Sequence, residues 1–180
     1  MLQDLPENHH DRTIATALAH VKRFMQAVDC GAHRGIVTRK LLKRFESVIA
    51  IEPGSLHSQI DPRATVINAA LGKEHKLVAL ADGTENTGQR HVVDGESVRM
   101  ITLDSLKLSP DFLKIDVEGL EYDVLIGGKQ TIQTHKPVIM VEENGLNRRY
   151  GIPDMAACAL LYSWGARRVE RIGKDYVFTW

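Results

Sequence analysis

The sequence predicts an α/β fold with a mostly parallel sheet. Along its 180 residues, short apolar segments that read as buried strands alternate with segments of helical periodicity. Some of these segments, such as residues 48–51, are apolar at every position, which is typical of strands that helices cover on both faces. Two strand-like segments flank Gly173 near the end of the sequence, and this pattern predicts a C-terminal antiparallel hairpin.

Residues 1–23 are expected to hold a polar arm (1–10) followed by one helix. Asp11 is a suitable N-cap, and apolar residues recur after it at helical spacing, at Ile14, Leu18 and Val21. Residues 24–180 form a single predicted domain, because no internal repeat or low-complexity segment divides them.

The predicted elements of this domain alternate in type. Strands are expected at 24–30, 48–51, 65–67, 112–116, 137–141, 167–172 and 176–180, and helices at 35–45, 119–126, 129–135 and 153–164. Residues 76–81 and 98–102 bracket a polar stretch that predicts a hairpin or a long loop, and long loops often carry binding residues. The polar or flexible residues of this stretch are Thr84, Asn86, Gly88 and His91.

Composition excludes several classes of function. The 23 Lys and Arg residues balance the 23 Asp and Glu residues, which argues against a protein that mainly neutralises nucleic-acid phosphates or an anionic membrane. Two cysteines cannot make a disulfide framework. No apolar stretch approaches ~18 residues, and the N-terminus does not resemble a signal peptide, so we expect a soluble, cytoplasmic protein.

A glycine turn and a strand-end acid predict a nucleotide-type site. The first strand ends at Asp29 and Gly31, where a glycine allows a sharp turn and close approach of a ligand; Gly35 allows close packing at the start of the helix. Glu52 closes the next strand, about 20 residues later, where a carboxylate accepts hydrogen bonds from the hydroxyls of an adenosine ribose. Such a turn also occurs in α/β domains that bind no nucleotide, and this alternative stays open.

The turn favours S-adenosylmethionine over a dinucleotide. A dinucleotide site prefers a second glycine where this chain has His33, because that glycine makes room for the pyrophosphate. The acidic Asp29 would repel a pyrophosphate and suits the ammonium and sulfonium groups of S-adenosylmethionine.

The sequence resembles the FkbM family of class I S-adenosylmethionine-dependent methyltransferases over about residues 24–180. The blocks that carry the resemblance are VDCGAHRG (28–35), VIAIEP (48–53), INAALG (67–72), ITLDSL (101–106), DFLKIDVEGLEYDVLIGG (111–128) and PVIMVEEN (137–144). The resemblance implies a Rossmann-like class I methyltransferase fold and an O-methyltransferase activity on a hydroxyl of a sugar or natural product.

The resemblance also implies roles for individual residues. Asp29 and Gly31 are expected at the methionine moiety, Glu52 at the ribose, and Asn68 with Ala69 near the adenine. Asp116 is expected to face the site of methyl transfer. The predicted cofactor-binding residues are Asp29, Gly31, Ala32, His33, Gly35, Glu52, Asn68, Ala69 and Asp116.

Three carboxylates around one strand-to-helix turn are the candidates for proton transfer. An alcohol acceptor must lose a proton to a nearby base, and we expect Asp116 or Glu118 to be that base or to orient the acceptor. The alternative is that these acids, Glu121 above all, cap the following helix and favour its dipole.

No metal is predicted. Oxygen ligands from Asp116, Glu142, Glu143 and Asn144 could meet at adjacent strand ends, as in Mg²⁺-dependent methyltransferases, but loop-capping and salt-bridge roles suit the two glutamates better. His91 is either a base or an ordinary loop histidine.

The sequence therefore predicts an S-adenosylmethionine-dependent O-methyltransferase. Its expected partner is a small-molecule or glycan acceptor, with no nucleic acid or membrane, and a homo-oligomer stays open. We expect the acceptor to be recognised by the N-terminal helix, residues 82–96, residues 144–152 or a neighbouring subunit. The alternatives are an NAD-dependent oxidoreductase, which His33 and the absence of a Tyr-x-x-x-Lys pair disfavour, and a non-catalytic S-adenosylmethionine-binding module.

Overall fold

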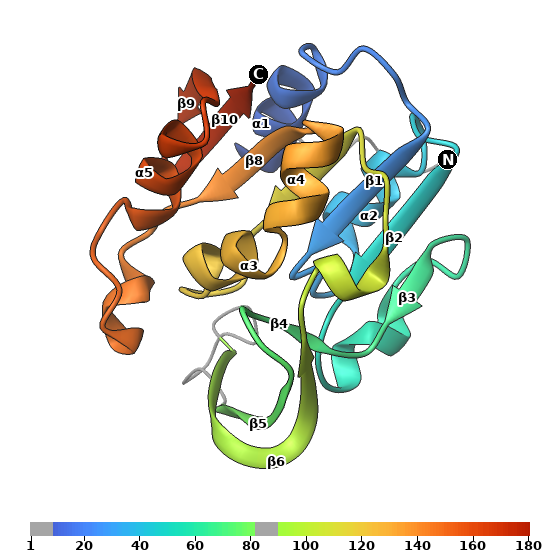
Figure 1. The fold of residues 1–180 in the computed structure, drawn as a ribbon. Helices are drawn as coiled ribbons and strands as arrows, with labels where there is room; N and C mark the ends of the chain where they lie inside the picture. The colour runs from blue at the N-terminus through green and yellow to red at the C-terminus, as the bar shows by residue number, and fades with distance from the viewer. Residues whose placement is uncertain (1–8, 82–89) are drawn as a thin grey trace.

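A seven-stranded sheet forms the centre of the computed structural model, which describes residues 9–81 and 90–180 (Figure 1). Its strands are β1 (Gln26–Cys30), β2 (Ser47–Ile51), β3 (Thr65–Ile67), β7 (Phe112–Ile115), β8 (Val138–Glu142), β9 (Arg167–Ile172) and β10 (Asp175–Thr179). They are arranged in the order β3-β2-β1-β7-β8-β10-β9. The pairs from β3 to β8 are parallel, whereas β10 is antiparallel to both β8 and β9, which confirms the predicted sheet and closing hairpin.

The order of the strands reverses between β1 and β7. β1 is followed along the chain by β2 and β3 on one side of the sheet, whereas β7 and β8 lie on the other side. Ligands of open α/β sheets bind beyond the carboxyl ends of the strands at such a point. The fold therefore places the candidate site at the carboxyl ends of β1 and β7.

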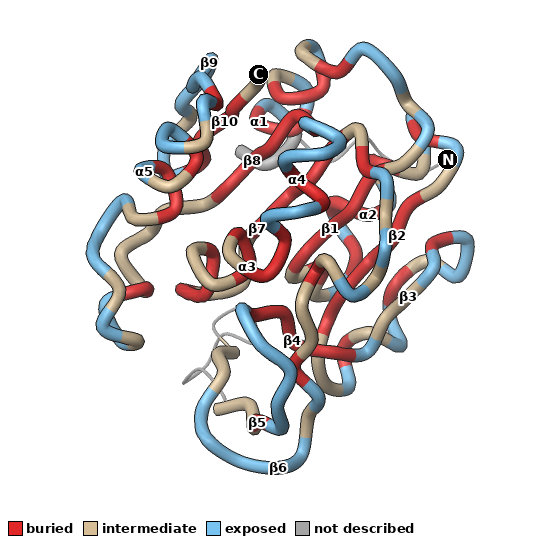
Figure 2. The backbone as a smooth tube through the Cα atoms, in the orientation of Figure 1, coloured by how far each residue is buried: buried red, intermediate tan, exposed pale blue. Residues whose placement is uncertain are grey.

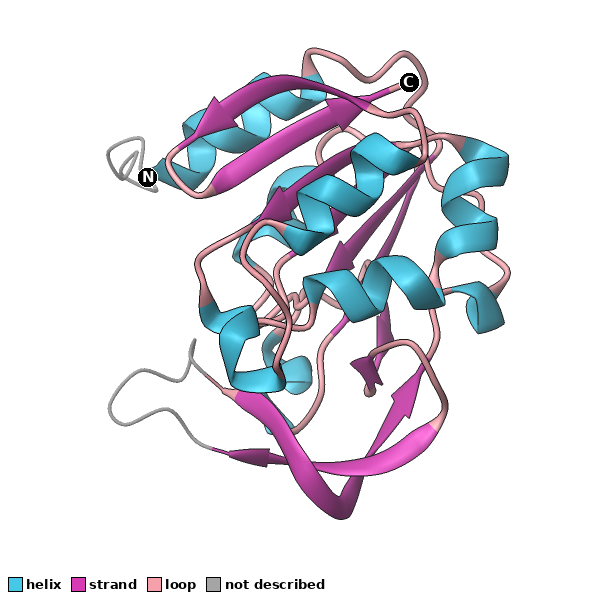
Figure 3. Cartoon of the chain, turned by 60° about the vertical axis from the view of Figure 1, so that its left-hand side comes forward, coloured by secondary structure: helices cyan, strands magenta, loops and turns pink. Residues whose placement is uncertain are grey.

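Helices cover both faces of the sheet. Helices α1 (His9–Leu18) and α2 (Ile36–Leu41) lie on one face, and α3 (Glu121–Gly127), α4 (Lys129–His135) and α5 (Ala156–Ser163) lie on the other (Figures 1 and 3). The alternation of side chains along a strand divides the core between these faces. In β1, Ala27 belongs to the cluster of α1 and α2, whereas Val28 belongs to the cluster of α3, α4 and α5. Figure 2 shows the resulting burial of the central strands.

Several boundaries differ from the predicted ones. α1 begins at His9, before the expected cap Asp11, and buries Ile14, Ala17 and Leu18 against the sheet. α2 ends at Leu41, and the next residues form turns rather than the helix predicted to residue 45. α5 begins at Ala156, because residues 154–155 form a turn in which Met155 has a positive φ of 61°.

A small second sheet projects beyond the carboxyl edge. Its strands β4 (Ala70–Leu71), β5 (Lys76–Ala81) and β6 (His91–Ile101) are arranged in the order β4-β6-β5, and β6 is a long curved strand (Figure 1). β5 and β6 form the expected hairpin, although β6 starts at His91 rather than near residue 98. Thr84, Asn86 and Gly88 lie outside the described residues. Within residues 9–81 and 90–180, no helix is long and apolar enough to cross a bilayer.

Candidate functional site

A cavity of about 460 Å³ lies at the carboxyl ends of β1, β2, β7 and β8. Its walls come from the turns that follow β1 and β7, from the end of β2, and from the first residues of β6. Residues 144–146, which lead into the 3₁₀-helix η4 (Leu146–Tyr150), contribute another wall. The cavity thus occupies the place that the strand order indicates.

The glycine turn after β1 brings two strand ends together. Gly31 has a φ of +78°, and a Cβ atom at this position would lie 1.8 Å from the backbone oxygen of Asp116. Gly35 has a φ of +73° and packs at the start of α2, where a Cβ atom would lie 3.2 Å from Ile60 Cγ2. The two glycines have the turning and packing roles predicted for them, and only Gly31 lines the cavity.

Glu52 forms the wall of the cavity beside this turn. Its buried carboxylate accepts a hydrogen bond from the backbone N–H of His33, with 2.9 Å between Oε2 and the nitrogen. Burial raises the pKa of Glu52 above its ordinary value, while the His33 hydrogen bond and the charge of Lys114 lower it. Burial, followed by the charges of Arg34 and Lys114, lowers the pKa of the His33 ring. Ala32, His33 and Glu52, three of the residues expected to bind the cofactor, all line the cavity.

The structure places Asp29 and Asn68, two of the residues expected to bind the cofactor, outside the lining of the cavity. The Asp29 carboxylate is fully buried below the cavity, where it accepts a hydrogen bond from Thr38 Oγ1 at 2.7 Å and forms an ion pair with Lys114 at 3.2 Å. Its charge is therefore compensated inside the protein by Lys114. Asn68 is exposed, and its Oδ1 accepts the backbone N–H of Gly54 at 3.0 Å. Its neighbour Ala69 lines the cavity, whereas Asn68 does not.

Lys114 was not among the predicted site residues. It lies in β7 directly opposite Asp29 of β1 and is only 4% exposed. Its Nζ is 2.8 Å from the backbone oxygen of Gly31 and 3.3 Å from Asp116 Oδ2. A lysine within an otherwise apolar strand was the available signal, because lysine is rarely buried without a partner.

The turn after β7 carries the two predicted catalytic carboxylates into the cavity wall. The Asp116 side chain is 28% exposed, and Glu118 has a positive φ of 58°, which is uncommon outside glycine. Glu118 Oε2 is buried and has no hydrogen-bond partner among the residues that the structure describes. Burial, followed by repulsion from Asp116 and Glu121, raises the pKa of Glu118 to about 7. An unpartnered carboxyl group beside a cavity is suited to bind a ligand group or to exchange a proton with it.

Glu121 has a different task. Its Oε1 accepts the backbone N–H groups of Val117 and Gly119, each at 3.0 Å, and its side chain is buried. Burial raises the pKa of Glu121 to about 7, against the effect of these hydrogen bonds. The capping interpretation therefore describes Glu121, which holds the turn that presents Glu118.

The acids at the end of β8 point to different partners. Glu142 lines the cavity, where its Oε2 accepts a hydrogen bond from Asn144 Nδ2 at 2.6 Å. Burial, then repulsion from Asp116 and Asp175, raises the pKa of Glu142 to about 8, and a hydrogen bond with Asp116 contributes.

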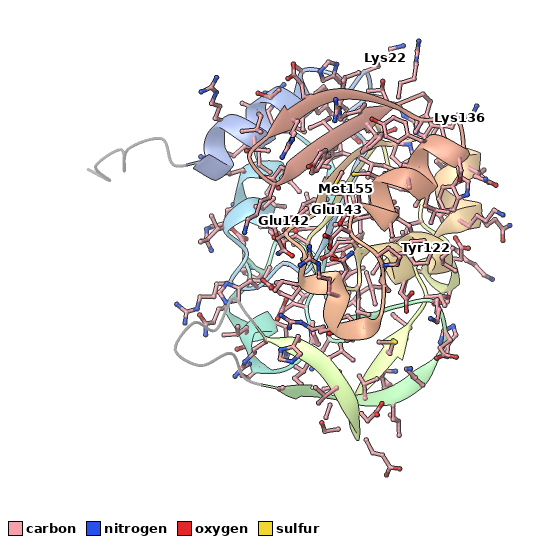
Figure 4. The ribbon with its side chains drawn as sticks, turned by 90° about the vertical axis from the view of Figure 1, so that its left-hand side faces the viewer. Lys22, Tyr122, Lys136, Glu142, Glu143 and Met155 are labelled. Carbon is pink, nitrogen blue, oxygen red and sulfur yellow. The ribbon has the colours of Figure 1, made fainter. Side chains whose placement is uncertain are left out.

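Glu143 turns instead to the start of α5. It accepts backbone N–H groups there, including that of Ala157 at 2.9 Å, which fits the capping role expected for it (Figure 4). Among the residues that the structure describes, no three His, Cys, Asp or Glu side chains form a group that could hold a metal ion.

The cover of the cavity comes from two segments that are far apart in sequence. His91 and Val92 of β6 line it, as does Leu146 of η4. Tyr150 joins the two segments, because its hydroxyl donates a hydrogen bond to the backbone oxygen of Val92 at 3.0 Å. Both segments lie in regions from which acceptor recognition was expected. The exposed Lys174, in the turn between β9 and β10, also borders the cavity.

Comparison with known proteins identifies the family. Residues 29–162 match the model of the methyltransferase FkbM domain. No curated protein matches the chain in sequence. A crystal structure of methyltransferase FkbM from Methylobacillus flagellatus KT is similar, with a TM-score of 0.56 and 18% identity; the match covers 99% of this chain and 56% of that one.

Two further solved structures have a similar fold. Precorrin-6y C5,15-methyltransferase from Geobacter metallireducens GS-15 has a TM-score of 0.55 at 13% identity, covering 100% of this chain and 92% of that one. A TehB-like SAM-dependent methyltransferase from Corynebacterium glutamicum has a TM-score of 0.50 at 12% identity, covering 95% and 86%. These structures confirm the predicted Rossmann-like methyltransferase fold. The chain spans about half the length of the Methylobacillus protein. Because residues 29–162 match the family model, the chain belongs to the FkbM methyltransferase family.

Proposed function

We propose that this protein uses S-adenosylmethionine to methylate a hydroxyl oxygen of a sugar or a similar polyhydroxylated small molecule. The observation that carries the proposal is one cavity with two unlike walls. One wall holds Glu52 beside the glycine turn. The other holds Glu118, whose Oε2 is buried without a hydrogen-bond partner in residues 9–81 and 90–180. Membership of the FkbM methyltransferase family and the fold shared with a SAM-dependent methyltransferase support the choice of cofactor.

The residues of the first wall fit S-adenosylmethionine. The close contact of Gly31 with the strand end of β7 leaves no room for a side chain, so backbone lines the cavity there. Glu52 accepts one hydrogen bond, from the backbone N–H of His33. Because a carboxylate has about four lone-pair sites, it can also accept hydrogen bonds from two ribose hydroxyls. When bound, S-adenosylmethionine supplies a methyl group on a positively charged sulfur, which is the electrophile.

The second wall suits an alcohol acceptor. An alcohol must lose its proton as the methyl group is transferred, and a base with a pKa near 7 is well matched to that task at neutral pH. Glu118 is the group we assign, since the pKa of its carboxyl is about 7 and no described residue forms a hydrogen bond with its Oε2. Glu142 and Asn144 offer a carboxyl and an amide for the other hydroxyls of a sugar-like acceptor.

Two measurements test this proposal. Calorimetry should show binding of S-adenosylmethionine and S-adenosylhomocysteine and no comparable binding of NAD. Mass spectrometry should then detect addition of one methyl group in a screen of monosaccharides, nucleotide sugars and polyketide alcohols. Binding of NAD alone would support the oxidoreductase alternative and contradict our proposal. Binding of S-adenosylmethionine without transfer to any hydroxyl compound would favour a non-catalytic binding module.

A further inference from the structure

A buried cation, Lys114, forms part of the wall of the cavity. Lys114 is 4% exposed, and three oxygen atoms surround its ammonium group: the backbone oxygen of Gly31 at 2.8 Å, Asp29 Oδ1 at 3.2 Å and Asp116 Oδ2 at 3.3 Å. A lysine ammonium has three N–H donors. Because three oxygens of the protein already face them, Lys114 is arranged to hold other groups rather than to bind a ligand itself.

The partners of Lys114 belong to the two walls of the cavity. Gly31 is the turn residue beside Glu52, whereas Asp116 begins the turn that presents Glu118. Asp29 anchors the lysine from below and is itself held by Thr38. One ammonium group therefore joins the two turns at the point where the strand order reverses.

We propose that Lys114 is the positioning residue of the transfer site. It fixes the glycine turn against Asp116, and its positive charge favours the ionised form of the nearby Glu118 carboxyl group. The proposal rests on the proposed function. Asp116 is ion-paired with Lys114, whereas burial, followed by repulsion from Asp116, raises the pKa of Glu142 to about 8, so Glu142 holds its proton near neutral pH. Glu118 is then the carboxylate left to accept the proton of the acceptor.

The charges around Glu118 agree with this assignment. Asp116 and Glu121 on its own turn raise the pKa of Glu118, whereas Arg149 of η4 and Lys114 of β7 lower it. Glu142 in turn is affected by Asp116, by Glu118 and by Asp175 of β10. Lys114 is therefore a buried positive charge in a setting dominated by carboxylates, and its removal should raise the pKa of Glu118.

The test compares Lys114→Met with two controls. Thr38→Val also removes a buried partner of Asp29 but keeps the lysine charge, and Lys73→Met removes a lysine from an exposed ion pair with Asp123. Titration of the glutamate carboxyl carbons by NMR, on the cofactor-free protein, gives the pKa of Glu118 without requiring activity. In Lys114→Met we expect the pKa of Glu118 to rise measurably above its value in the wild type, because one of the two positive charges that lower it is lost. Both controls should titrate as the wild type does.

Kinetics provides the second readout. In Lys114→Met the pH at which kcat reaches half its maximum should rise together with the pKa of Glu118, and KM for S-adenosylmethionine should rise at least several-fold because the glycine turn loses its anchor. Lys73→Met should leave both values unchanged. If Lys114→Met does not fold, the double variant Asp29→Asn, Lys114→Met replaces it in both experiments. The double variant does not leave the Asp29 carboxylate buried without a compensating charge.

An unchanged Glu118 titration in a folded Lys114 variant would overturn the proposal. A wild-type protein that neither binds S-adenosylmethionine nor transfers a methyl group would instead contradict the proposed function. In that case the NMR titration would still decide whether Lys114 controls the carboxyl groups.

Discussion

The two walls of the cavity satisfy their polar groups in opposite ways. On the wall beside β2, Glu52 is held by the backbone of His33, and Gly31 is fixed by contact with the next strand end. On the wall beside β8, Glu118 Oε2 is buried without a hydrogen-bond partner in the described part of the chain, and Glu142 lies close to other acidic residues. The first wall is ordered before any ligand arrives, whereas the second keeps carboxyl groups available.

This difference indicates that the first wall serves binding and the second serves proton transfer. Preformed hydrogen bonds and close backbone contacts reduce the cost of ordering a ligand, which favours binding. Carboxyl groups with raised pKa values exchange protons near neutral pH, which favours chemistry. Changes on the first wall should therefore act on stability and affinity, and changes on the second should act on turnover.

The largest effect is expected from Gly31→Ala. The new Cβ atom would overlap the backbone oxygen of Asp116 and would hold an alanine at positive φ, so we expect a loss of stability above about 4 kcal/mol. Gly165→Ala is the matched control, because Gly165 also has a positive φ (+89°) but nothing lies within 4 Å of its Cβ position. The control should lose only about 1–3 kcal/mol. Urea unfolding measures both, and equal losses would show that the close contact is unimportant.

The next largest effect is expected from Glu118→Gln. Loss of a general base lowers kcat by about 10²–10⁴-fold. Glu121→Gln is the control, because Glu121 has the same raised pKa but its Oε1 is occupied by two backbone N–H groups, which a glutamine oxygen can still accept. Its kcat should stay within a few-fold of the wild type. Similar losses in both variants would argue that the turn, rather than the Glu118 carboxylate, matters for turnover.

Glu121 also predicts a dependence of stability on pH. In the folded protein burial raises its pKa from 4.5 to about 7, so the folded state keeps a proton that the unfolded state releases. The free energy of unfolding should therefore fall as the pH rises from about 4.5 to about 7, by roughly 1–3 kcal/mol for this group. Urea unfolding of Glu121→Gln at pH 5 and pH 8 should show a smaller difference than the wild type. Glu170→Gln, on the exposed strand β9, should behave as the wild type.

The smallest effect concerns the cover of the second wall. Tyr150→Phe removes the hydrogen bond to Val92 that joins η4 to β6, at a cost of about 0.5–1.5 kcal/mol. We expect KM for the acceptor to rise a few-fold while the affinity for S-adenosylmethionine stays the same. Tyr162→Phe on the exposed side of α5 is the control. A change confined to cofactor affinity would place the acceptor elsewhere.

The sequence predicted the parts of the site that depend on local order along the chain. The glycine turn and Glu52 follow directly from strand, turn, helix and strand in succession, and the structure puts Gly31 and Glu52 where that succession implies. The strands of the main sheet were also predictable, because buried parallel strands are apolar throughout.

The rest depends on how strands pair. The partnership of Asp29 with Lys114 arises from the register of β1 and β7, which are more than 80 residues apart in the sequence and are not paired by any local pattern. The same register holds the buried Asp29 carboxylate in an ion pair with Lys114, and Lys114 rather than Asp29 lines the cavity. The long strand β6 was largely missed, because its middle residues are exposed and polar and contain Gly95.

The division between the two walls can be tested directly by titrating S-adenosylhomocysteine into Glu52→Ala and Glu118→Gln under identical conditions. We predict that Glu52→Ala weakens binding by about 1–3 kcal/mol, because two ribose hydrogen bonds are lost, while Glu118→Gln binds as tightly as the wild type. Unchanged affinity in Glu52→Ala, or a larger loss in Glu118→Gln, would contradict the assignment of cofactor binding to the first wall and proton transfer to the second.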